Sequence, residues 1–228
     1  MREASRSERP SRTGAHLRTA RSKQRRGRRG PDRRRHGPDR GLLLRGARLF
    51  LRGIGETDLK RETAKTPARF AEAWAREILA GYRADPGRIL ASTFRSSEEG
   101  MVVVRDIPFV SVCAHHLLPF LGTAHVAYIP SGRLVGLSKV ARLVDALSRR
   151  LQLQERLGRQ VVESLDRSLR PAGVACRMEA EHLCMTIRGA RKRSARVVTA
   201  AYAGAFRKSP SLRAEFLRLC DRPAGRRR

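Results

Sequence analysis

The order of strand-like and helix-like segments constrains the fold of this chain more than any other feature of its sequence. Two strand-like runs follow residue 100, two helical patterns come next, and further β-like runs stand after those. Strands grouped in this way form antiparallel sheets, whereas strands that alternate regularly with helices build parallel sheets. The sequence therefore predicts an α+β protein with an antiparallel sheet backed by helices.

The predicted strands are short runs rich in β-branched residues. The first, residues 101–112, contains Pro108, which indicates an edge or a bulge because proline cannot donate to a neighbouring strand. The second, residues 122–130, ends at the turn sequence PSGR. The remaining predicted strands are residues 174–180, 183–188 and 196–202.

The predicted helices carry apolar residues at helical spacing. In residues 66–82, Thr66 is the expected N-cap and Pro67 the first helical residue. Gly81 is expected to end this helix. Further helices are predicted in residues 137–151, where Ser138 is the expected cap, in residues 153–169, and in residues 211–220.

The first 40 residues are rich in arginine and have almost nothing to bury. They hold 15 Lys and Arg against 4 Asp and Glu, in a chain whose formal net charge is +29. Such a segment cannot offset the entropy lost on ordering, so residues 1–40 are predicted to be a disordered tail. Its charge suggests weak contact with polyanions.

Cysteine usage and hydropathy indicate the compartment. Four cysteines in a chain of this length favour a reducing environment over a disulfide scaffold. The most apolar early run, residues 41–53, is short and interrupted by three arginines, and no apolar core of a secretory signal precedes it. We therefore expect a cytoplasmic protein with no membrane partner.

Two separate pairs of cysteine and histidine indicate a metal site. The run VCAHHLLPF contains Cys113, His115 and His116, but a single C-x-x-H spacing is weak evidence for a metal. His182 and Cys184 form a second pair, and in a strand residues two apart share a face. Because thiolate and imidazole are ligands that zinc prefers, the donors of these two segments predict a zinc site.

Spacing alone leaves two kinds of zinc site open. With Cys113, His116 and Cys184 as ligands, a fourth position stays free for water, and His115 and His182 remain as bases for hydrolysis. A structural site that takes one of those two histidines as a fourth ligand fits the spacing equally well.

Basic residues near a predicted helix start suit an anionic ligand. Lys139 and Arg142 share a helical face beside Ser138, and helix N-termini bind phosphate. If residues 183–188 form a strand, Arg188 lies on the same face of it as Cys184. Arg69 lies in the first turn of an earlier predicted helix. In a chain this rich in arginine, each of them alone is also explained as a surface charge.

Glu155 is the third feature that can bind a ligand. Its carboxylate can accept two parallel hydrogen bonds, such as those from N1–H and the exocyclic amine of guanine. A glutamate in the first turn of a helix is also favoured by the helix dipole. Taken by itself, Glu155 is therefore better interpreted as a surface residue.

Five stretches, matching in order and spacing, together resemble the GTP cyclohydrolase I family over residues 42–220. They are RDIPFVSVCAHHLLPF, AYIPSGRLVGLSKVARLV, LQLQERL, EAEHLCMTIRG and AFRKSPSLRAEFL. The resemblance implies the tunnelling fold, an α+β fold whose antiparallel sheet is backed by helices and preceded by a helical N-terminal segment. It places the family domain in residues 41–228, with N-terminal helices in 41–98 and the catalytic part in 99–222.

The resemblance also implies an activity and roles for particular residues. The activity is zinc-dependent hydrolysis of GTP to 7,8-dihydroneopterin triphosphate and formate, the first step of folate and tetrahydropterin biosynthesis. The implied assembly is a homodecamer of two pentamers with active sites between subunits. The implied zinc ligands are Cys113, His116 and Cys184; the catalytic residues are His115, His182 and Ser138; the substrate is bound by Glu155, the Gln154 backbone, Lys139, Arg142, Arg188 and Arg69.

One position departs from the family pattern. Ala114 stands where the family usually has glutamate, and loss of that carboxylate removes a hydrogen-bonding partner for the metal site. The alternatives to the GTP enzyme are a catalytically impaired relative, a sibling pterin or deazapurine enzyme on the same fold, and a basic nucleic-acid-binding protein with a structural zinc. The low aromatic content, 5%, disfavours the last of these.

Overall fold

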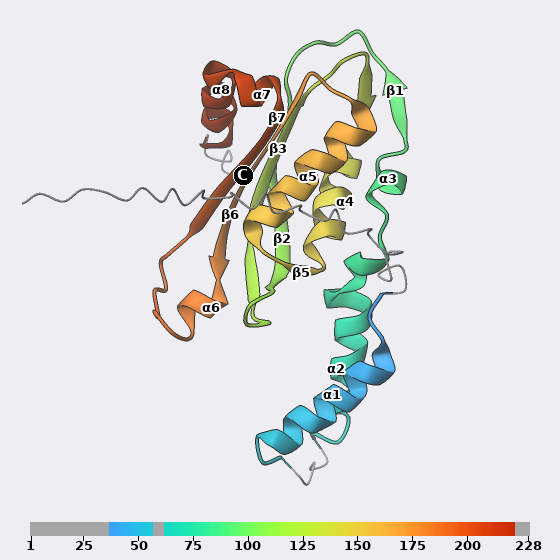
Figure 1. Ribbon diagram of the computed structural model, residues 1–228, viewed down its shortest axis with the longest axis vertical. Coiled ribbons are helices and arrows are strands. Elements are labelled where there is room, and N and C mark those ends of the chain that lie inside the picture. Colours follow the sequence, from blue (N-terminus) through green and yellow to red (C-terminus); the bar gives the residue numbers. More distant parts are fainter. Residues whose placement is uncertain (1–36, 57–61, 222–228) are drawn as a thin grey trace, which may run out of the picture. The chain divides into compact units, whose positions relative to one another are not determined.

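The computed structural model describes residues 37–56 and 62–221 (Figure 1). Residues 1–36 of the predicted tail lie outside the described residues, and so does the end of the chain after Asp221. None of the helices in the described ranges has the length and apolar character needed to cross a membrane.

Within the described residues, five strands form the main sheet in the order β5-β2-β3-β6-β7. Strands β2, β3, β6 and β7 pair antiparallel, and β5 adds a two-residue parallel pairing to β2. A separate ribbon pairs β1 with β4. The strands are Thr93–Arg95 (β1), Val102–Cys113 (β2), Pro119–Ile129 (β3), Arg133–Val135 (β4), Leu151–Gln152 (β5), Gly173–His182 (β6) and Val197–Gly204 (β7).

Helices cover the sheet, which confirms the predicted α+β architecture. Helices α4 and α5 lie across one face, and α8 lies near the opposite end of the sheet from α6 (Figure 1). The helical elements are α1 (Arg40–Gly53), α2 (Thr66–Ala73), a π-helical turn (Trp74–Ile78), a 3₁₀ turn (Ala80–Arg83), α3 (Pro86–Ile89), α4 (Leu137–Ser148), α5 (Gln154–Leu169), α6 (Leu183–Thr186), α7 (Ala205–Lys208) and α8 (Pro210–Asp221).

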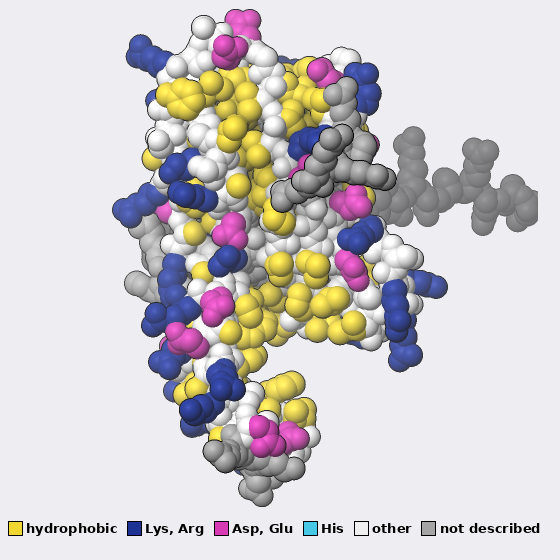
Figure 2. Space-filling view, turned by 180° about the vertical axis from the view of Figure 1, so that it is seen from behind, with side chains coloured by type: hydrophobic (Ala, Val, Ile, Leu, Met, Phe, Trp, Pro, Cys, Tyr) yellow, Lys and Arg dark blue, Asp and Glu magenta, His cyan; other side chains and the backbone are white. Residues whose placement is uncertain are grey.

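The two faces of the sheet pack against different helices because successive strand residues point to opposite sides. Val126 of β3 lies in the large core formed with α4 and α5, whereas its neighbour Ala127 packs with Phe206 of α7 and Phe216 of α8. Figure 2 shows the molecule from the side away from α4 and α5, where hydrophobic side chains gather between Lys and Arg side chains at the margins.

Strand β2 confirms the prediction made from Pro108. The pairing with β3 shifts between Val104 and Ile107, and Asp106 in this bulge has a φ of 56°. The only strand on the outer side of β2 within the described residues is β5, which pairs with its last two residues. Pro108 therefore follows a bulge on an outer stretch of strand, where its missing N–H interrupts no ladder.

The helix predicted in residues 66–82 is divided rather than continuous. Thr66 is its first helical residue, and the N-cap is Lys65, whose side chain makes no capping hydrogen bond. Gly81 lies inside the 3₁₀ turn instead of ending the helix. A Cβ atom at Gly81 would lie 2.1 Å from the Ala146 carbonyl oxygen, so close packing on α4 explains this glycine.

Residues 183–188 were predicted as a strand, and this prediction is wrong. Strand β6 ends at His182, opposite Phe120, and β3 begins only one residue before that position. Beyond His182 the chain has almost no partner strand left, and it turns into the short helix α6. The apolar run was compatible with a strand, but the length of its neighbour decided its structure.

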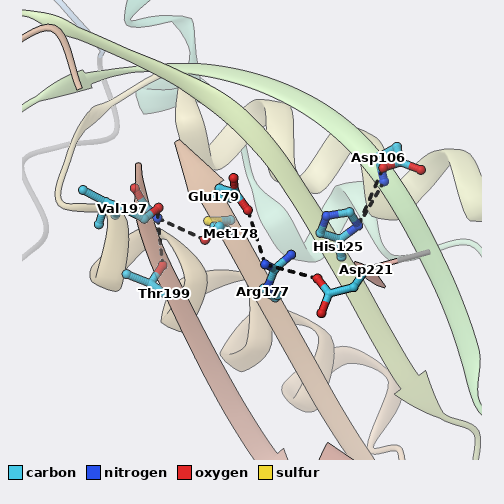
Figure 3. A network of polar contacts seen from close by, with 9 residues as sticks. Asp106, His125, Arg177, Met178, Glu179, Val197, Thr199 and Asp221 are labelled. Atoms are coloured by element: carbon cyan, nitrogen blue, oxygen red, sulfur yellow. Dashed lines mark hydrogen bonds and ion pairs between the residues drawn. The ribbon is translucent and has the colours of Figure 1, made fainter. Parts of the chain in front are cut away.

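A buried histidine lies on the face of the sheet that α8 covers. His125 of β3 is 5% exposed, and its Nδ1 accepts a hydrogen bond from the Asp106 N–H at 3.3 Å (Figure 3). Arg177, which binds Glu179 and Asp221, lies in the same network, as does Arg105. Burial lowers the pKa of His125, and the two arginines lower it further, against the opposing effects of Asp106 and Asp221.

We expect the stability of the protein to fall as the pH drops below about 6.5, the pKa of an unperturbed histidine. The unfolded state binds a proton on His125 more readily than the folded state does, because the pKa of His125 is lower in the folded protein. The contribution of neutral His125 to stability is therefore complete above the unfolded-state pKa and is lost as the pH falls towards the folded-state pKa. In thermal unfolding between about pH 7 and 5, the Tm of His125→Gln should fall less than that of the wild type. An identical fall in both proteins would contradict this origin.

Candidate metal centre and active site

Three of the predicted ligands meet at one end of the sheet. The donor atoms of Cys113, His116 and Cys184 all lie within 4.8 Å of one another. Cys113 is buried, Cys184 is half-buried, and His116 is exposed. Within the described residues, no other group of three or more His, Cys, Asp or Glu donors meets this condition.

Local backbone structure brings the three residues together. Cys113 is the last residue of β2, and a turn follows in which its N–H binds the Leu118 carbonyl and its own carbonyl accepts from Leu117. Leu117 adopts a φ of 56° in this turn, which presents His116 beside Cys113. Cys184 comes from α6, because β6 ends at the same edge of the sheet where β3 begins.

The position of Cys184 corrects part of the sequence analysis. We expected His182 and Cys184 to share one face of a strand, but only His182 is in a strand and Cys184 is in a helix. Arg188 likewise shares no strand face with Cys184, because it follows α6 and is not in a strand. Cys184 belongs to the cluster and Arg188 reaches His116 because the chain turns after β6. The alternation of side chains along a strand is not the reason.

The donor set fits a thiophilic divalent cation. The pKa of the Cys184 thiol is raised by burial and by the neighbouring Cys113 thiol, because two thiolates side by side repel each other. A cation between the sulfur atoms would remove that penalty, and two thiolates with one imidazole form a ligand set that zinc prefers. The residues present therefore fit a zinc ion with three protein ligands.

His116 also contacts an arginine. The Nη1 atom of Arg188 lies 2.8 Å from Nε2 of His116, and both side chains are exposed. Because a guanidinium has no acceptor, Arg188 donates and His116 accepts. A metal ion bound through that nitrogen would take the same lone pair and leave Arg188 available for an anionic ligand.

His182 is held rigidly beside the metal ligands. Its ring stacks on Phe120, with centroids 4.5 Å apart and an interplanar angle of 6°, and its Nε2 lies 2.8 Å from Oε1 of Gln154. Burial lowers the pKa of His182, and the nearby Glu155 carboxylate acts in the opposite direction. His115 is exposed, and its ring lies 6.3 Å from that of His116 in an edge-on arrangement.

Glu155 is the second residue of α5, next to Gln154 and close enough to His182 to affect its titration. It is exposed at one end of a groove of about 730 Å³ between α5 and β7, which Arg159 and Tyr202 also line. The carboxylate is therefore available to a ligand that approaches the metal cluster.

The predicted phosphate-binding residues do not lie with the metal cluster in one chain. Ser138, Lys139 and Arg142 are at the start of α4, whose N-cap is Gly136 rather than Ser138. The start of α4 follows Val135, whose N–H binds the hydroxyl of Tyr128 at the far end of β3 from Phe120.

The other end of α4 lies near the cluster. The carbonyl of Ser148, its last residue, accepts from the hydroxyl of Ser111, two residues before Cys113. A helix of this length spans on the order of 15 Å, so Ser138 and Lys139 are about that far from the end of α4 that contacts Ser111. Arg69 is exposed on α2, which packs on α1, and no contact in the described residues links it to the cluster.

Sequence reasoning missed the side chains of Gln154 and Phe120. It assigned only the backbone of Gln154 to the site and gave no role to Phe120. Both side chains hold His182 in place. Their sequence neighbourhood, a glutamine in the first turn of a helix and a phenylalanine at a strand start, is ordinary and gave no signal of this contact.

An antiparallel sheet with two cysteines and a histidine gathered at one end, and with further histidines beside them, defines an α+β protein with a three-donor cluster that could hold a metal ion. Residues 45–221 match the family described as GTP cyclohydrolase I. The chain belongs to the GTP cyclohydrolase I family.

Named relatives agree with this match. The chain is 48% identical over 172 residues to GTP cyclohydrolase 1 of Pelotomaculum thermopropionicum, covering 75% of this chain and 91% of that protein. It is 50% identical over 177 residues to GTP cyclohydrolase 1 of Thermobifida fusca, covering 77% and 85%. A solved structure, the archaeosine synthase QueF-Like in the apo form, covers 46% of this chain and 94% of its own at 20% identity, but its TM-score of 0.39 supports no conclusion.

Proposed function

We propose that this chain hydrolyses GTP to 7,8-dihydroneopterin triphosphate and formate, using zinc held by Cys113, His116 and Cys184. The observation that carries the proposal is the convergence of these three donors beside His182 at the end of the sheet. Family membership and the relatives' names support GTP as the substrate. The reaction begins folate and tetrahydropterin biosynthesis, and we place it in the cytoplasm.

Zinc bound to the three ligands would supply a Lewis acid that lowers the pKa of a coordinated water to about 7. The carboxylate of Glu155 accepts the N1–H and the exocyclic amine of guanine, while the Gln154 backbone borders the same base. His182 takes and returns a proton at its ring nitrogen as the imidazole ring of the purine opens. His115, exposed beside His116, exchanges that proton with solvent.

The triphosphate and ribose need the residues at the start of α4. Lys139 and Arg142 bind phosphate oxygens there, Ser138 assists the ribose rearrangement, and Arg188 and Arg69 add positive charge around the phosphates. Because the start of α4 lies at the far end of this helix from the predicted metal ligands of the same chain, we propose that a second copy supplies it. This incomplete site supports a homo-oligomer, which we propose is the decamer of two pentamers.

Mixed oligomers are expected to recover activity that two variants lack separately. Cys113→Ala removes a ligand, and Lys139→Glu reverses a charge at the start of α4. Random co-assembly of equal amounts gives about a quarter of sites with both halves intact, so about a quarter of wild-type activity should return. Co-expression with two different tags, followed by tandem purification and assay, measures this. Inactive mixed oligomers would contradict a site shared between copies.

The proposed activity is tested by incubating the purified full-length chain with GTP and, in parallel, with ATP. We expect formate and a fluorescent oxidised pterin from GTP alone, because adenine lacks the adjacent donors that Glu155 accepts. Equal turnover of both nucleotides, or of neither, would reject the proposal.

Ala114 supports the second candidate, an impaired relative that keeps the fold and the metal. Ala114 is half-buried, and its N–H binds the Gln152 carbonyl at 3.0 Å, so the backbone of this turn is held without a carboxylate side chain. The contact that His116 makes is with Arg188 and not with an acid. The GTP assay separates the two candidates.

A further inference from the structure

The side chain of Gln154 makes an unusual set of contacts for the first residue of a helix. It is 2% exposed, and its Nε2 lies 2.9 Å from the Val197 carbonyl oxygen, 3.2 Å from the Met178 carbonyl oxygen and 3.1 Å from Oγ1 of Thr199. Figure 3 shows Met178 of β6 close to Val197 and Thr199 of β7. The amide therefore joins α5 to two strands of the sheet.

These contacts fix which way round the amide lies. Carbonyl oxygens only accept hydrogen bonds, so the group that faces Val197 and Met178 has to be the amide NH₂. The Gln154 oxygen then points at His182, 2.8 Å from its Nε2. Exchanging the amide nitrogen and oxygen would set an oxygen against two carbonyl oxygens, which is unfavourable.

The fixed amide in turn fixes the histidine. An amide oxygen can only accept, so Nε2 of His182 carries a hydrogen and donates it to Gln154. In the neutral ring, Nδ1 is then the nitrogen with the free lone pair. Stacking on Phe120 sets the plane of the ring, and Gln154 sets its rotation within that plane.

We propose that the Gln154 side chain is a positioning residue that fixes the ring orientation of His182 and holds it as the Nε2–H tautomer, which leaves the lone pair on Nδ1. This role differs from contact with the guanine base, for which only the Gln154 backbone is needed. It rests on the proposed function for its effect on turnover, but not for the tautomer.

Two substitutions separate the acceptor from the rest of the side chain. Gln154→Met keeps the length but removes both the donors and the acceptor, whereas Gln154→Glu removes the donors and keeps an oxygen opposite Nε2. Both leave the Val197 and Met178 carbonyls without this donor, and Gln154→Glu also sets an oxygen towards them, so its structural loss is the larger of the two. Gln160→Met is the matched control, because Gln160 lies on the same helix and binds Gln152 instead of His182.

The tautomer is read directly by ¹⁵N solid-state NMR of the sedimented zinc-loaded full-length protein, labelled at its 6 histidines. The signals of His182 are identified by their loss in His182→Asn. We expect one tautomer, protonated at Nε2, in the wild type, in Gln160→Met and in Gln154→Glu, and a mixture in Gln154→Met. A wild-type ring protonated at Nδ1, or an unchanged ring in Gln154→Met, would overturn the proposal.

Kinetics test whether Gln154 acts through His182. We expect Gln154→Met to lower kcat about 10–100-fold, with KM for GTP changed less than about threefold and zinc content unchanged. In a His182→Ala background the same substitution should cost less than about twofold, because the group that it positions is gone. An equal loss in both backgrounds would refute action through His182.

The two readouts distinguish failure of this inference from failure of the proposed function. If the wild type forms no product from GTP while its His182 tautomer depends on Gln154, the proposed function is wrong and the positioning role stands. If the wild type forms product and its tautomer does not respond to Gln154, the positioning role is wrong and the function stands.

Discussion

Replacing Cys184 by serine is expected to remove zinc from the protein and to lower kcat/KM for GTP by about a thousandfold or more. Cys184 is one of only two thiols in the donor cluster, and a serine hydroxyl is a poor ligand for zinc at neutral pH. Zinc content by mass spectrometry and formate release from GTP measure the two effects together.

Cys220→Ser is the matched control for this substitution. Cys220 is a buried thiol of α8 that packs with Phe206 and Phe216 and belongs to no donor cluster within the described residues. We expect that variant to keep its zinc and its turnover. If Cys184→Ser kept both as well, the three-ligand site would be refuted.

His182→Ala is expected to lower kcat about 10²–10⁴-fold while leaving one zinc per chain. His182 is near the donor cluster, but it is not among the residues whose donor atoms all lie within 4.8 Å of one another. Its loss should therefore remove proton transfer without removing the metal. The measurement is kcat with GTP alongside zinc content of the same preparation.

The same variant decides the alternative that spacing left open. A structural site with His182 as a fourth ligand predicts that zinc and folded structure are lost together in His182→Ala. His125→Gln is the control, because His125 lies in the same sheet but faces α8. Loss of zinc from His182→Ala and not from His125→Gln would contradict a catalytic role of the kind we propose.

Much of the fold could be predicted because its signals are local. The helix predicted in residues 153–169 is confirmed as α5, in which Leu157 and Leu169 are buried and Leu153 is the N-cap. Pro108 marked a bulged outer strand correctly. The errors are the strand at residues 183–188, the helix end at Gly81 and the caps at Thr66 and Ser138. The length of a neighbouring strand decided the first, and close packing on α4 decided the second.

The site could be predicted only in part, for a physical reason. Residue types and motif order select the ligands Cys113, His116 and Cys184, and the fold brings them together. Sequence order did not indicate that the start of α4 lies at the other end of the sheet from this cluster within one chain. The amide of Gln154 reaches His182 across 28 positions of sequence, so no local pattern could indicate it.

Ala114 is a departure from the family pattern directly beside Cys113. The family resemblance places a glutamate there, and this chain provides a methyl group beside the ligand turn. Because the three donors, His182 and Glu155 are all in place without it, we expect Ala114 to be a tolerated change. The impaired-relative alternative predicts the opposite.

The most direct test is turnover of GTP by the purified full-length protein, loaded with zinc and checked for its oligomeric state, with and without a chelator. We predict stoichiometric formate and dihydroneopterin triphosphate from the zinc-loaded oligomer, loss of both products with the chelator, and their return when zinc is restored. A zinc-loaded oligomer that releases no formate from GTP would contradict the account and would make Ala114 the mark of an inactive relative.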